Sequence, residues 1–342
     1  MTVFVTGATG FVAGHCIAEL LTHGYSVRAS VRDLERAPLD HLRRIAADAQ
    51  QELAFVEASL DSDDGWDAAL DGCEAVWHVA SPNPKDAPAS EDEVVRPAVD
   101  GTLRVLRAAA RSGTVRRVVL TSSSDAVTAG HPRSERRVRT EADWADPAGA
   151  APYAKSKVLA EQAAWEFVRS TDLELVTIVP GLVVGPLQRA ESRASMETVR
   201  LLLAGELPLV PHLGFAVVDV RDVATAHRLA TEVPEAAGER YIVAGEGMWM
   251  EDIARVLAEE FTPRGHKIPT RRMPYWLMWA VARFDRTVRL SLPYANRPAL
   301  LSSAKAAREL GWTGRPTRES ILDAASSLLE VGIVPSARPR GS

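Results

Sequence analysis

The sequence predicts an α/β protein, in which a doubly wound parallel sheet is followed by a smaller, mostly helical lobe toward the C-terminus. Over the first 180 residues, short β-rich runs alternate with helical patterns, as they do in βαβ units. Several of these runs are almost wholly apolar, which is typical of parallel strands covered on both faces. Beyond residue 180 the alternation ends, proline and glycine become frequent, and helical patterns then dominate.

The first part of the chain contains six expected strands, each short and rich in branched apolar residues. They cover residues 3–6, 26–31, 54–56, 75–79, 118–121 and 175–179. Helical patterns with apolar residues three and four positions apart lie between them, at 14–23, 91–112 and 153–170. Parallel strands need such crossover helices, because each strand must start again from the same end of the sheet.

The later part contains two further expected strands, at 216–220 and 239–243. Its expected helices are 222–231, 250–261, 274–288, 302–310 and 318–331. We assign residues 1–185 to a sheet domain to which 216–244 return, and residues 186–215 and 245–334 to the smaller lobe. The last eight residues, 335–342, are polar and rich in helix-breaking residues, so we expect a disordered tail.

Composition narrows the class of protein. With 46% hydrophobic and 25% charged residues, the 342-residue chain resembles soluble globular proteins, and a net charge of −5 gives no basis for binding nucleic acid or a membrane surface. Cys16 and Cys73 lack metal-site or redox spacing, so we expect two buried thiols in a reducing, cytoplasmic setting. No leader pattern precedes the first strand, and the histidine spacing predicts no metal site.

A glycine pattern follows the first strand directly. Gly7-x-x-Gly10-x-x-Ala13 lies between that strand and the first helix. Gly7 permits a tight turn, Gly10 lets the backbone approach a pyrophosphate, and the N-terminus of the helix presents N–H groups to it. In this context the pattern predicts a Rossmann-type dinucleotide site, whereas a tight turn without a ligand is the alternative.

The end of the second strand indicates which dinucleotide binds. Enzymes that use NAD place an acid there for the ribose hydroxyls, but this chain has Arg32, with the neutral Ser30 two residues earlier. A guanidinium suits the 2′-phosphate of NADP(H), and Arg28 and Arg36 are candidates to assist it. Asp33 follows directly and leaves NAD open.

A tyrosine and a lysine carry the expected chemistry. Tyr153 and Lys157 are four residues apart, so they share one face of the helix expected at 153–170. A phenol has an ordinary pKa near 10, and a nearby ammonium lowers it toward neutral pH. We expect Tyr153 to protonate a carbonyl oxygen during hydride transfer, and Lys157 also to hold the nicotinamide ribose. A hydroxyl for the same oxygen comes from Ser122, Ser123 or Ser124, and spacing does not choose among them.

Five segments occur in a recognisable order: 6–13, 76–82, 121–123, the Tyr153-x-x-x-Lys157 pair and 180–186. Together they resemble the extended short-chain dehydrogenases/reductases. Within these, the chain is similar to the dihydroflavonol-4-reductase-like branch, which includes cinnamoyl-CoA reductases and aldehyde/ketone reductases. The resemblance extends over residues 2–333.

The resemblance implies a role for individual residues. It selects Ser123 as the catalytic serine beside Tyr153 and Lys157, and it matches Arg32 to the arginine that binds the 2′-phosphate. The residues that it implies in cofactor binding are Thr6, Gly7, Thr9, Gly10, Phe11, Val12, Arg32, Leu60, Val79, Ala80, Ser81, Thr121, Tyr153, Lys157, Pro180, Gly181, Leu182 and Val183.

The chain departs from this branch at three places. Ser59 precedes Leu60 where relatives often have an aspartate near the adenine. Thr128 stands where the plant dihydroflavonol reductases have an asparagine that contacts the flavonoid, which argues against a flavonoid substrate. Ser124 and Asp125 replace a pair of small residues. We favour Asp125 as a cap for the following turn, and a polar edge of the pocket is the alternative.

The sequence thus predicts NADPH-dependent reduction of an aldehyde or ketone, reversible as an alcohol dehydrogenase. Alternatives are an NAD-dependent sugar-nucleotide epimerase or a hydroxysteroid dehydrogenase of the same fold, or a non-catalytic dinucleotide sensor. The expected partner is a small carbonyl or alcohol substrate. Dimers are common among the enzymes that the chain resembles, so the resemblance also points to a homodimer. The sequence identifies neither the substrate nor the stereochemical preference of the reaction.

Overall fold

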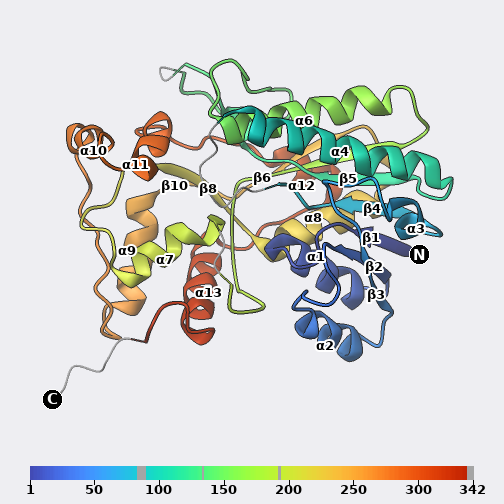
Figure 1. The fold of residues 1–342 in the computed structure, drawn as a ribbon. Coiled ribbons are helices and arrows are strands. Elements are labelled where there is room, and N and C mark those ends of the chain that lie inside the picture. The colour runs from blue at the N-terminus through green and yellow to red at the C-terminus, as the bar shows by residue number, and fades with distance from the viewer. Residues whose placement is uncertain (83–89, 133–134, 192–193, 337–342) are drawn as a thin grey trace.

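The computed structural model of the chain describes residues 1–82, 90–132, 135–191 and 194–336. Of the tail that we expected to be disordered, residues 337–342 lie outside this described part. Figure 1 shows two regions: a large sheet flanked by helices, which contains the N-terminus, and a smaller lobe on the side of the C-terminus.

The large sheet is fully parallel among its seven strands, in the order β3-β2-β1-β4-β5-β6-β9. Each of the six strands expected in the first part is present, which confirms the predicted fold class. The strands are β1 (Thr2–Val5), β2 (Ser26–Val31), β3 (Leu53–Glu57), β4 (Ala75–His78), β5 (Arg117–Thr121), β6 (Glu174–Pro180) and β9 (Arg240–Val243). The strand order reverses at β1, between β2 and β4, so a crevice for a ligand is expected at the carboxyl ends there.

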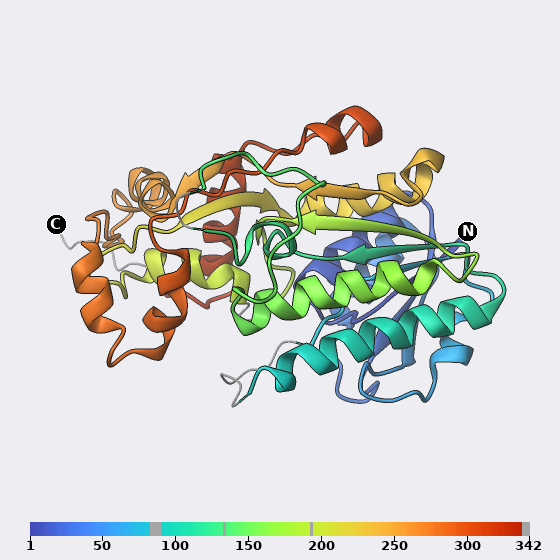
Figure 2. The same ribbon diagram turned by 90° about the horizontal axis from the view of Figure 1, so that it is seen from above.

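Helices cover both faces of this sheet, because alternate residues of each buried strand point to opposite sides. In β1, Val3 and Val5 belong to one core cluster and Phe4 to another. The first face carries α1 (Phe11–Thr22), α2 (Asp40–Ala49), α8 (Val220–Glu232) and α12 (Ala304–Leu310). The second carries α3 (Trp66–Leu70), α4 (Asp92–Ser112) and α6 (Pro152–Val168), and α4 and α6 lie side by side in Figure 2.

The smaller lobe has a sheet and a core of its own. Its three strands are β7 (Leu182–Val184), β8 (Gly214–Asp219) and β10 (Gly247–Trp249), with β8 in the centre. The helices of the lobe pack around a second apolar cluster. They are α7 (Glu197–Ala204), α9 (Met250–Phe261), α10 (Tyr275–Val281), α11 (Arg286–Ser291) and α13 (Thr317–Glu330). The lobe also has the short 3₁₀ turns η1 (Ala194–Met196) and η3 (Leu292–Tyr294), whereas η2 (Pro234–Ala236) packs in the large sheet region.

Three details differ from the sequence expectations. The single helix expected at 274–288 is two helices: α10 ends at Val281, and α11 begins after Asp285, whose carboxylate caps it by accepting the N–H of Val288. Helices α2 and α7 and strands β7 and β10 were not predicted. Within 216–244, α8 and β9 belong to the large sheet region, whereas β8 pairs with β7 and β10 in the lobe.

The cysteines behave as predicted. Cys16 on α1 and Cys73 before β4 are both buried, and both thiols are free. Within the described part of the chain, no helix combines the length and apolar character that crossing a bilayer requires.

Candidate functional site

A single cleft of about 1560 Å³ runs along the carboxyl ends of the large sheet and continues under the smaller lobe. Its volume exceeds the roughly 300–1,000 Å³ typical of ligand pockets. Every residue to which the resemblance gives a role in catalysis or cofactor binding lines this cleft, whereas the two candidate assisting arginines, Arg28 and Arg36, do not. The structure therefore brings these residues together, while the role of each one stays a prediction.

The glycine loop forms one end of the cleft. Gly7 has a φ of +72°, and a Cβ there would lie 2.9 Å from the Cβ of Ala80 on the neighbouring strand's loop. Gly10 precedes α1, and no side chain of the described residues caps that helix. The loop thus holds an open helix N-terminus close to the backbone that follows β4, as a pyrophosphate site requires.

The hydroxyl of Thr6 holds this loop in place. Its Oγ1 accepts the N–H groups of Val79 and Ala80 at 3.0 and 2.9 Å. The same oxygen lies 3.0 Å from Nδ1 of His78, whose pKa is lowered to about 3 by burial and by the charge of Lys157. The Thr6 oxygen already accepts two N–H groups, and His78 is neutral at physiological pH, so the Thr6 hydroxyl donates its proton to Nδ1 of His78. The side chain of Thr6 thus joins the ends of β1 and β4.

Two neighbouring charges at the end of β2 have different surroundings. Arg32 is exposed and lines the cleft, and among the residues that the structure describes none pairs with its guanidinium. Asp33 instead serves its own turn, since its Oδ1 accepts the N–H groups of Glu35 and Arg36 at 3.0 Å each. Asp33 was the reason to keep NAD as an alternative cofactor, but its carboxylate binds the backbone of its own turn. The guanidinium of Arg32, by contrast, is available to a ligand.

Of the two arginines expected to assist, Arg28 has a structural role. Its Nη1 donates to the backbone oxygens of Ala69 and Asp71 at 3.0 and 2.7 Å, away from the cleft. Arg36 forms an ion pair with Asp33 at 3.5 Å. The suggestion that Arg28 assists is therefore wrong, because β2 directs its side chain to the turn after α3.

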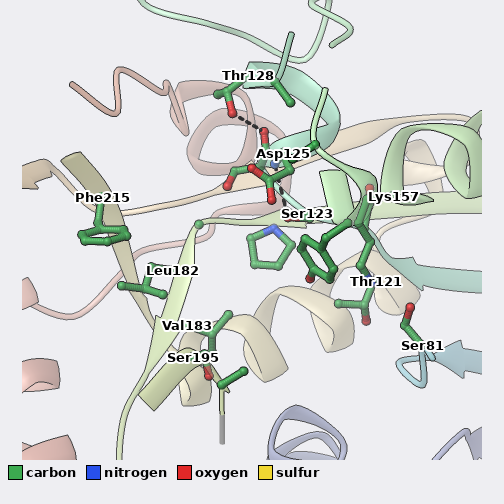
Figure 3. Close-up of a pocket in the computed structure, with 18 of the residues that line it drawn as sticks. Ser81, Thr121, Ser123, Asp125, Thr128, Lys157, Leu182, Val183, Ser195 and Phe215 are labelled. Carbon is green, nitrogen blue, oxygen red and sulfur yellow. Dashed lines mark hydrogen bonds between the residues drawn. The ribbon is translucent and has the colours of Figure 1, made fainter. Parts of the chain in front are cut away.

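Helix α6 supplies the tyrosine and the lysine. Pro152 occupies its first turn, where the missing N–H of proline costs nothing, and Tyr153 follows at once. Lys157 lies one turn later on the same face, with Nζ 5.6 Å from the centroid of the Tyr153 ring. Figure 3 shows Lys157 reaching toward the cleft near Thr121 and Ser123.

The pKa shifts differ from the sequence expectation. Tyr153 keeps 45% of its surface accessible in the cleft, yet desolvation and then the charge of Asp125 raise its pKa above the ordinary value. A side chain in a cleft can touch solvent and still lack the bulk water that stabilises a phenolate. The pKa of Lys157 is lowered to about 8 by burial, which Asp125 partly opposes. The expected lowering of the Tyr153 pKa is therefore wrong for the protein without a ligand.

The three serines after β5 have separate surroundings. Ser122 is buried and its hydroxyl donates to Glu161 of α6, so it has a structural partner. The Oγ of Ser123 accepts the backbone N–H of Asp125 at 3.2 Å, which leaves its hydroxyl proton for a ligand. The N–H of Ser124 donates to the carbonyl of Pro180 at 2.8 Å. All three serines line the cleft, but the hydroxyl of Ser122 is engaged by Glu161, so the hydrogen bonds favour Ser123 or Ser124 and the choice of Ser123 stays a prediction.

Asp125 begins the short helix α5 (Asp125–Thr128), but its carboxylate does not cap that helix within the described structure. It lines the cleft, and in Figure 3 it lies beside Ser123 on the side of the pocket where Lys157 enters. Burial raises the pKa of Asp125 to about 6, against the opposing effect of Lys157. The favoured cap is therefore wrong, and the polar edge of the pocket is what the structure has.

A buried histidine, which the sequence analysis missed, supports the end of β5. Nε2 of His227 lies 2.7 Å from Oγ1 of Thr121, and its Nδ1 lies 2.8 Å from the carbonyl of Val223. The carbonyl requires a proton on Nδ1, so the Thr121 hydroxyl donates to Nε2. Burial lowers the pKa of His227 to about 4, which keeps the ring neutral. The hydroxyl of Thr121 thus points to the scaffold.

The smaller lobe closes the far end of the cleft with apolar and aromatic side chains. Leu182 and Phe215 stand on β7 and β8 and face the pocket in Figure 3. Met278 of α10 and Tyr294 of η3 line the same end. Tyr294 lies near enough to Asp125 and Tyr153 for their charges to raise its pKa, after burial. No sequence pattern marks Tyr294, because its position depends on how the lobe folds back.

Comparison with known proteins gives consistent matches. Residues 3–244 match the NAD dependent epimerase/dehydratase family. The chain is 34% identical to the cinnamoyl-CoA reductase CAD2 of Medicago truncatula, over 96% of this chain and 95% of that protein.

In the described part of the chain, no cluster of His, Cys, Asp and Glu suited to a metal ion occurs.

Two solved structures are similar over nearly their whole length. Yeast methylglyoxal/isovaleraldehyde reductase Gre2, in complex with NADPH, has a TM-score of 0.80 and 29% identity, and covers 98% of this chain and 100% of that one. Vestitone reductase from alfalfa (Medicago sativa) has a TM-score of 0.75 and 28% identity, and covers 97% of this chain and 99% of that one.

Proposed function

The chain belongs to the NAD dependent epimerase/dehydratase family, and from that membership we propose that it is a reductase of the short-chain dehydrogenase/reductase type. Its proposed reaction is the NADPH-dependent reduction of an aldehyde or ketone to the alcohol, reversible as an alcohol dehydrogenase. One observation supports this most strongly: the Tyr153–Lys157 pair and the glycine loop line the same cleft.

The residues of the cleft fit NADP(H). The open N-terminus of α1 and the close approach of Gly7 to Ala80 suit a pyrophosphate. Arg32, with no partner among the described residues, suits the 2′-phosphate, since a guanidinium offers several donors in one plane. When bound, NADPH supplies the hydride for the carbonyl carbon. The yeast reductase Gre2, which has a similar fold, was solved in complex with NADPH, and this similarity supports the same cofactor here.

Side chains of the protein then bind and protonate the carbonyl oxygen of the substrate. Ser123 donates a hydrogen bond to that oxygen, and Tyr153 donates the proton that completes the alcohol. Because its pKa is raised, Tyr153 is protonated at neutral pH, as the reduction requires. Lys157 binds the ribose hydroxyls, and its ammonium stabilises the phenolate that remains after proton transfer.

The alternatives have less support. An NAD-dependent epimerase or hydroxysteroid dehydrogenase is expected to have an acid for the ribose at the end of β2, but Asp33 is held by its own turn and Arg32 faces the cleft. A non-catalytic sensor has no need of Tyr153 and Lys157 on one helical face. The cytoplasmic location, the homodimer and the division into domains stay predictions.

The test is oxidation of NADPH and NADH against a panel of aldehydes, aryl ketones and keto esters. We expect turnover with NADPH, none without a carbonyl, and little with NADH. Tight retention of NAD⁺ through purification, with no carbonyl reduced, would support the epimerase alternative. A preference for NADH would overturn the role proposed for Arg32.

A further inference from the structure

Asp125 is an acidic side chain beside the catalytic candidates that the proposed reaction does not use. It follows Ser123 by two residues, and its own N–H donates to Oγ of Ser123 at 3.2 Å. This backbone contact fixes where α5 begins, and with it the position of the carboxylate. Figure 3 shows Asp125 and Ser123 adjacent at the edge of the pocket.

The carboxylate has no protein donor. Within the described part of the chain, no hydrogen bond or ion pair reaches its oxygens, although it lies in a cleft where burial penalises a charge. The hydroxyl of Thr128, one turn away, donates instead to the carbonyl of Ser124 at 3.0 Å. Asp125 is partly buried in the cleft. A partly desolvated carboxylate without donors costs free energy, which a donor on a bound ligand would offset.

Three ionisable side chains of the described structure lie near the carboxylate of Asp125. Lys157 and Tyr153 come from α6, and Tyr294 comes from η3 of the smaller lobe; the pKa of each responds to the charge of Asp125. Tyr153 and Lys157 are committed to the carbonyl oxygen and the ribose in the proposed reaction. Leu182 and Phe215 contribute apolar surface opposite, and Thr128, His131 and Arg297 line the same cleft.

We infer that Asp125 determines substrate specificity by accepting a hydrogen bond from a hydroxyl on the carbon next to the reacting carbonyl. The substrate class is then the α-hydroxy ketones and α-hydroxy aldehydes. This inference rests on the proposed function. We choose the adjacent carbon because Figure 3 shows the Asp125 side chain beside Ser123, the serine proposed to bind the carbonyl oxygen.

A second role for Asp125, as a charge partner of Lys157 alone, predicts a different result. A charge partner changes the rate on every carbonyl by a similar factor, so the ratio between two substrates stays constant. A hydroxyl acceptor changes the ratio itself. Sites that bind a substrate hydroxyl discriminate strongly against analogues that lack it, because a buried polar group is then left without a partner.

The experiment compares kcat/KM for 2-hydroxyacetophenone with that for 2-methoxyacetophenone, and hydroxyacetone with methoxyacetone, using NADPH. Each pair keeps the oxygen and replaces its proton with a methyl group, so the donor is lost and the group becomes larger. A preference that comes from size alone should persist in Asp125→Ala. We expect the wild type to favour the hydroxyl member by about 10-fold or more, as the loss of a hydrogen bond to a charged group implies. Asp125→Ala should bring the ratio close to 1. Asp61→Asn removes a charge elsewhere in the same cleft and should keep the wild-type ratio.

The outcomes separate the two proposals. A ratio near 1 in the wild type, or a wild-type ratio that survives in Asp125→Ala, overturns the inference while the reductase stands. If neither member of either pair, nor any carbonyl of the panel, oxidises NADPH, the proposed function itself fails. Should Asp125→Ala not fold, Asp125→Asn keeps the size of the side chain, and a wild-type ratio in that variant counts against a role for the charge.

Discussion

The carboxylate of Asp125 and the ammonium of Lys157 share one cleft, and each opposes the effect of burial on the other. Burial raises the pKa of Asp125 to about 6, and Lys157 holds it from rising further. Burial lowers the pKa of Lys157 to about 8, and Asp125 holds it from falling further. Between these two values both side chains are charged, so the cleft contains an anion and a cation near the carbonyl site at neutral pH.

This relationship predicts a pH dependence. Lys157 loses its proton above pH about 8, so kcat/KM for reduction should fall there. Asp125→Asn removes the negative charge that raises the pKa of Lys157, so the fall should begin at lower pH. A pH profile of the wild type and the variant checks this. An unchanged alkaline limb in Asp125→Asn would show that the two charges do not act on each other.

The serines after β5 predict two different phenotypes. Ser123→Ala removes the donor proposed for the carbonyl oxygen, and kcat should fall about 10²-fold or more, as for other oxyanion donors. Ser122→Ala removes a hydroxyl that donates to Glu161, and should lower the free energy of unfolding by about 1–2 kcal/mol with a much smaller effect on kcat. Steady-state kinetics and urea unfolding of both variants test the assignment. The reverse pattern would move the catalytic role to Ser122.

We expect Arg32 to determine the preference for NADPH over NADH. Replacing it with alanine should raise KM for NADPH by about 10–100-fold and leave KM for NADH nearly unchanged, since only NADPH carries the 2′-phosphate. Arg43→Ala is the matched control, because Arg43 is an exposed arginine of α2 that pairs with Asp40 at 3.1 Å and does not line the cleft. Equal losses for both cofactors in Arg32→Ala would mean that this arginine acts on the fold rather than on the phosphate.

We expect Glu161 to stabilise the fold without contacting the ligand. It is 1% exposed and accepts hydrogen bonds from Ser122, Thr177 and Arg240. Glu161→Ala leaves the Arg240 guanidinium buried without its partner, so the free energy of unfolding should drop by about 3–5 kcal/mol. Glu166→Ala, on the exposed side of the same helix, should cost less than about 1 kcal/mol. Similar small losses in both would contradict a structural role for the buried pair.

The large sheet and its ligand end were predictable because their signals are local. Apolar runs gave the strands, and the glycine pattern after β1 marked the turn that approaches Ala80. Tyr153 and Lys157 followed from their four-residue spacing on one helix. In each case neighbouring residues along the chain determine the geometry.

Features that depend on long-range packing were not predictable in this way. The sheet of the lobe joins β7, β8 and β10 from three distant segments. Tyr294 lines the cleft from η3 of the smaller lobe, which packs against α11, and His227 supports Thr121 across a separation of 106 residues. The raised pKa of Tyr153 depends on burial and on Asp125, neither of which spacing along one helix reveals.

The most direct test of the account is Tyr153→Phe, measured in a single turnover with excess enzyme, NADPH and a carbonyl that the wild type reduces. Fluorescence titration should give the same NADPH affinity within about 2-fold, since the ring remains and the 2′-phosphate contact is untouched. We predict that alcohol formation falls by about 10³-fold or more, because the proton donor for the carbonyl oxygen is gone. Alcohol formation at the wild-type rate in Tyr153→Phe would contradict the proposed mechanism.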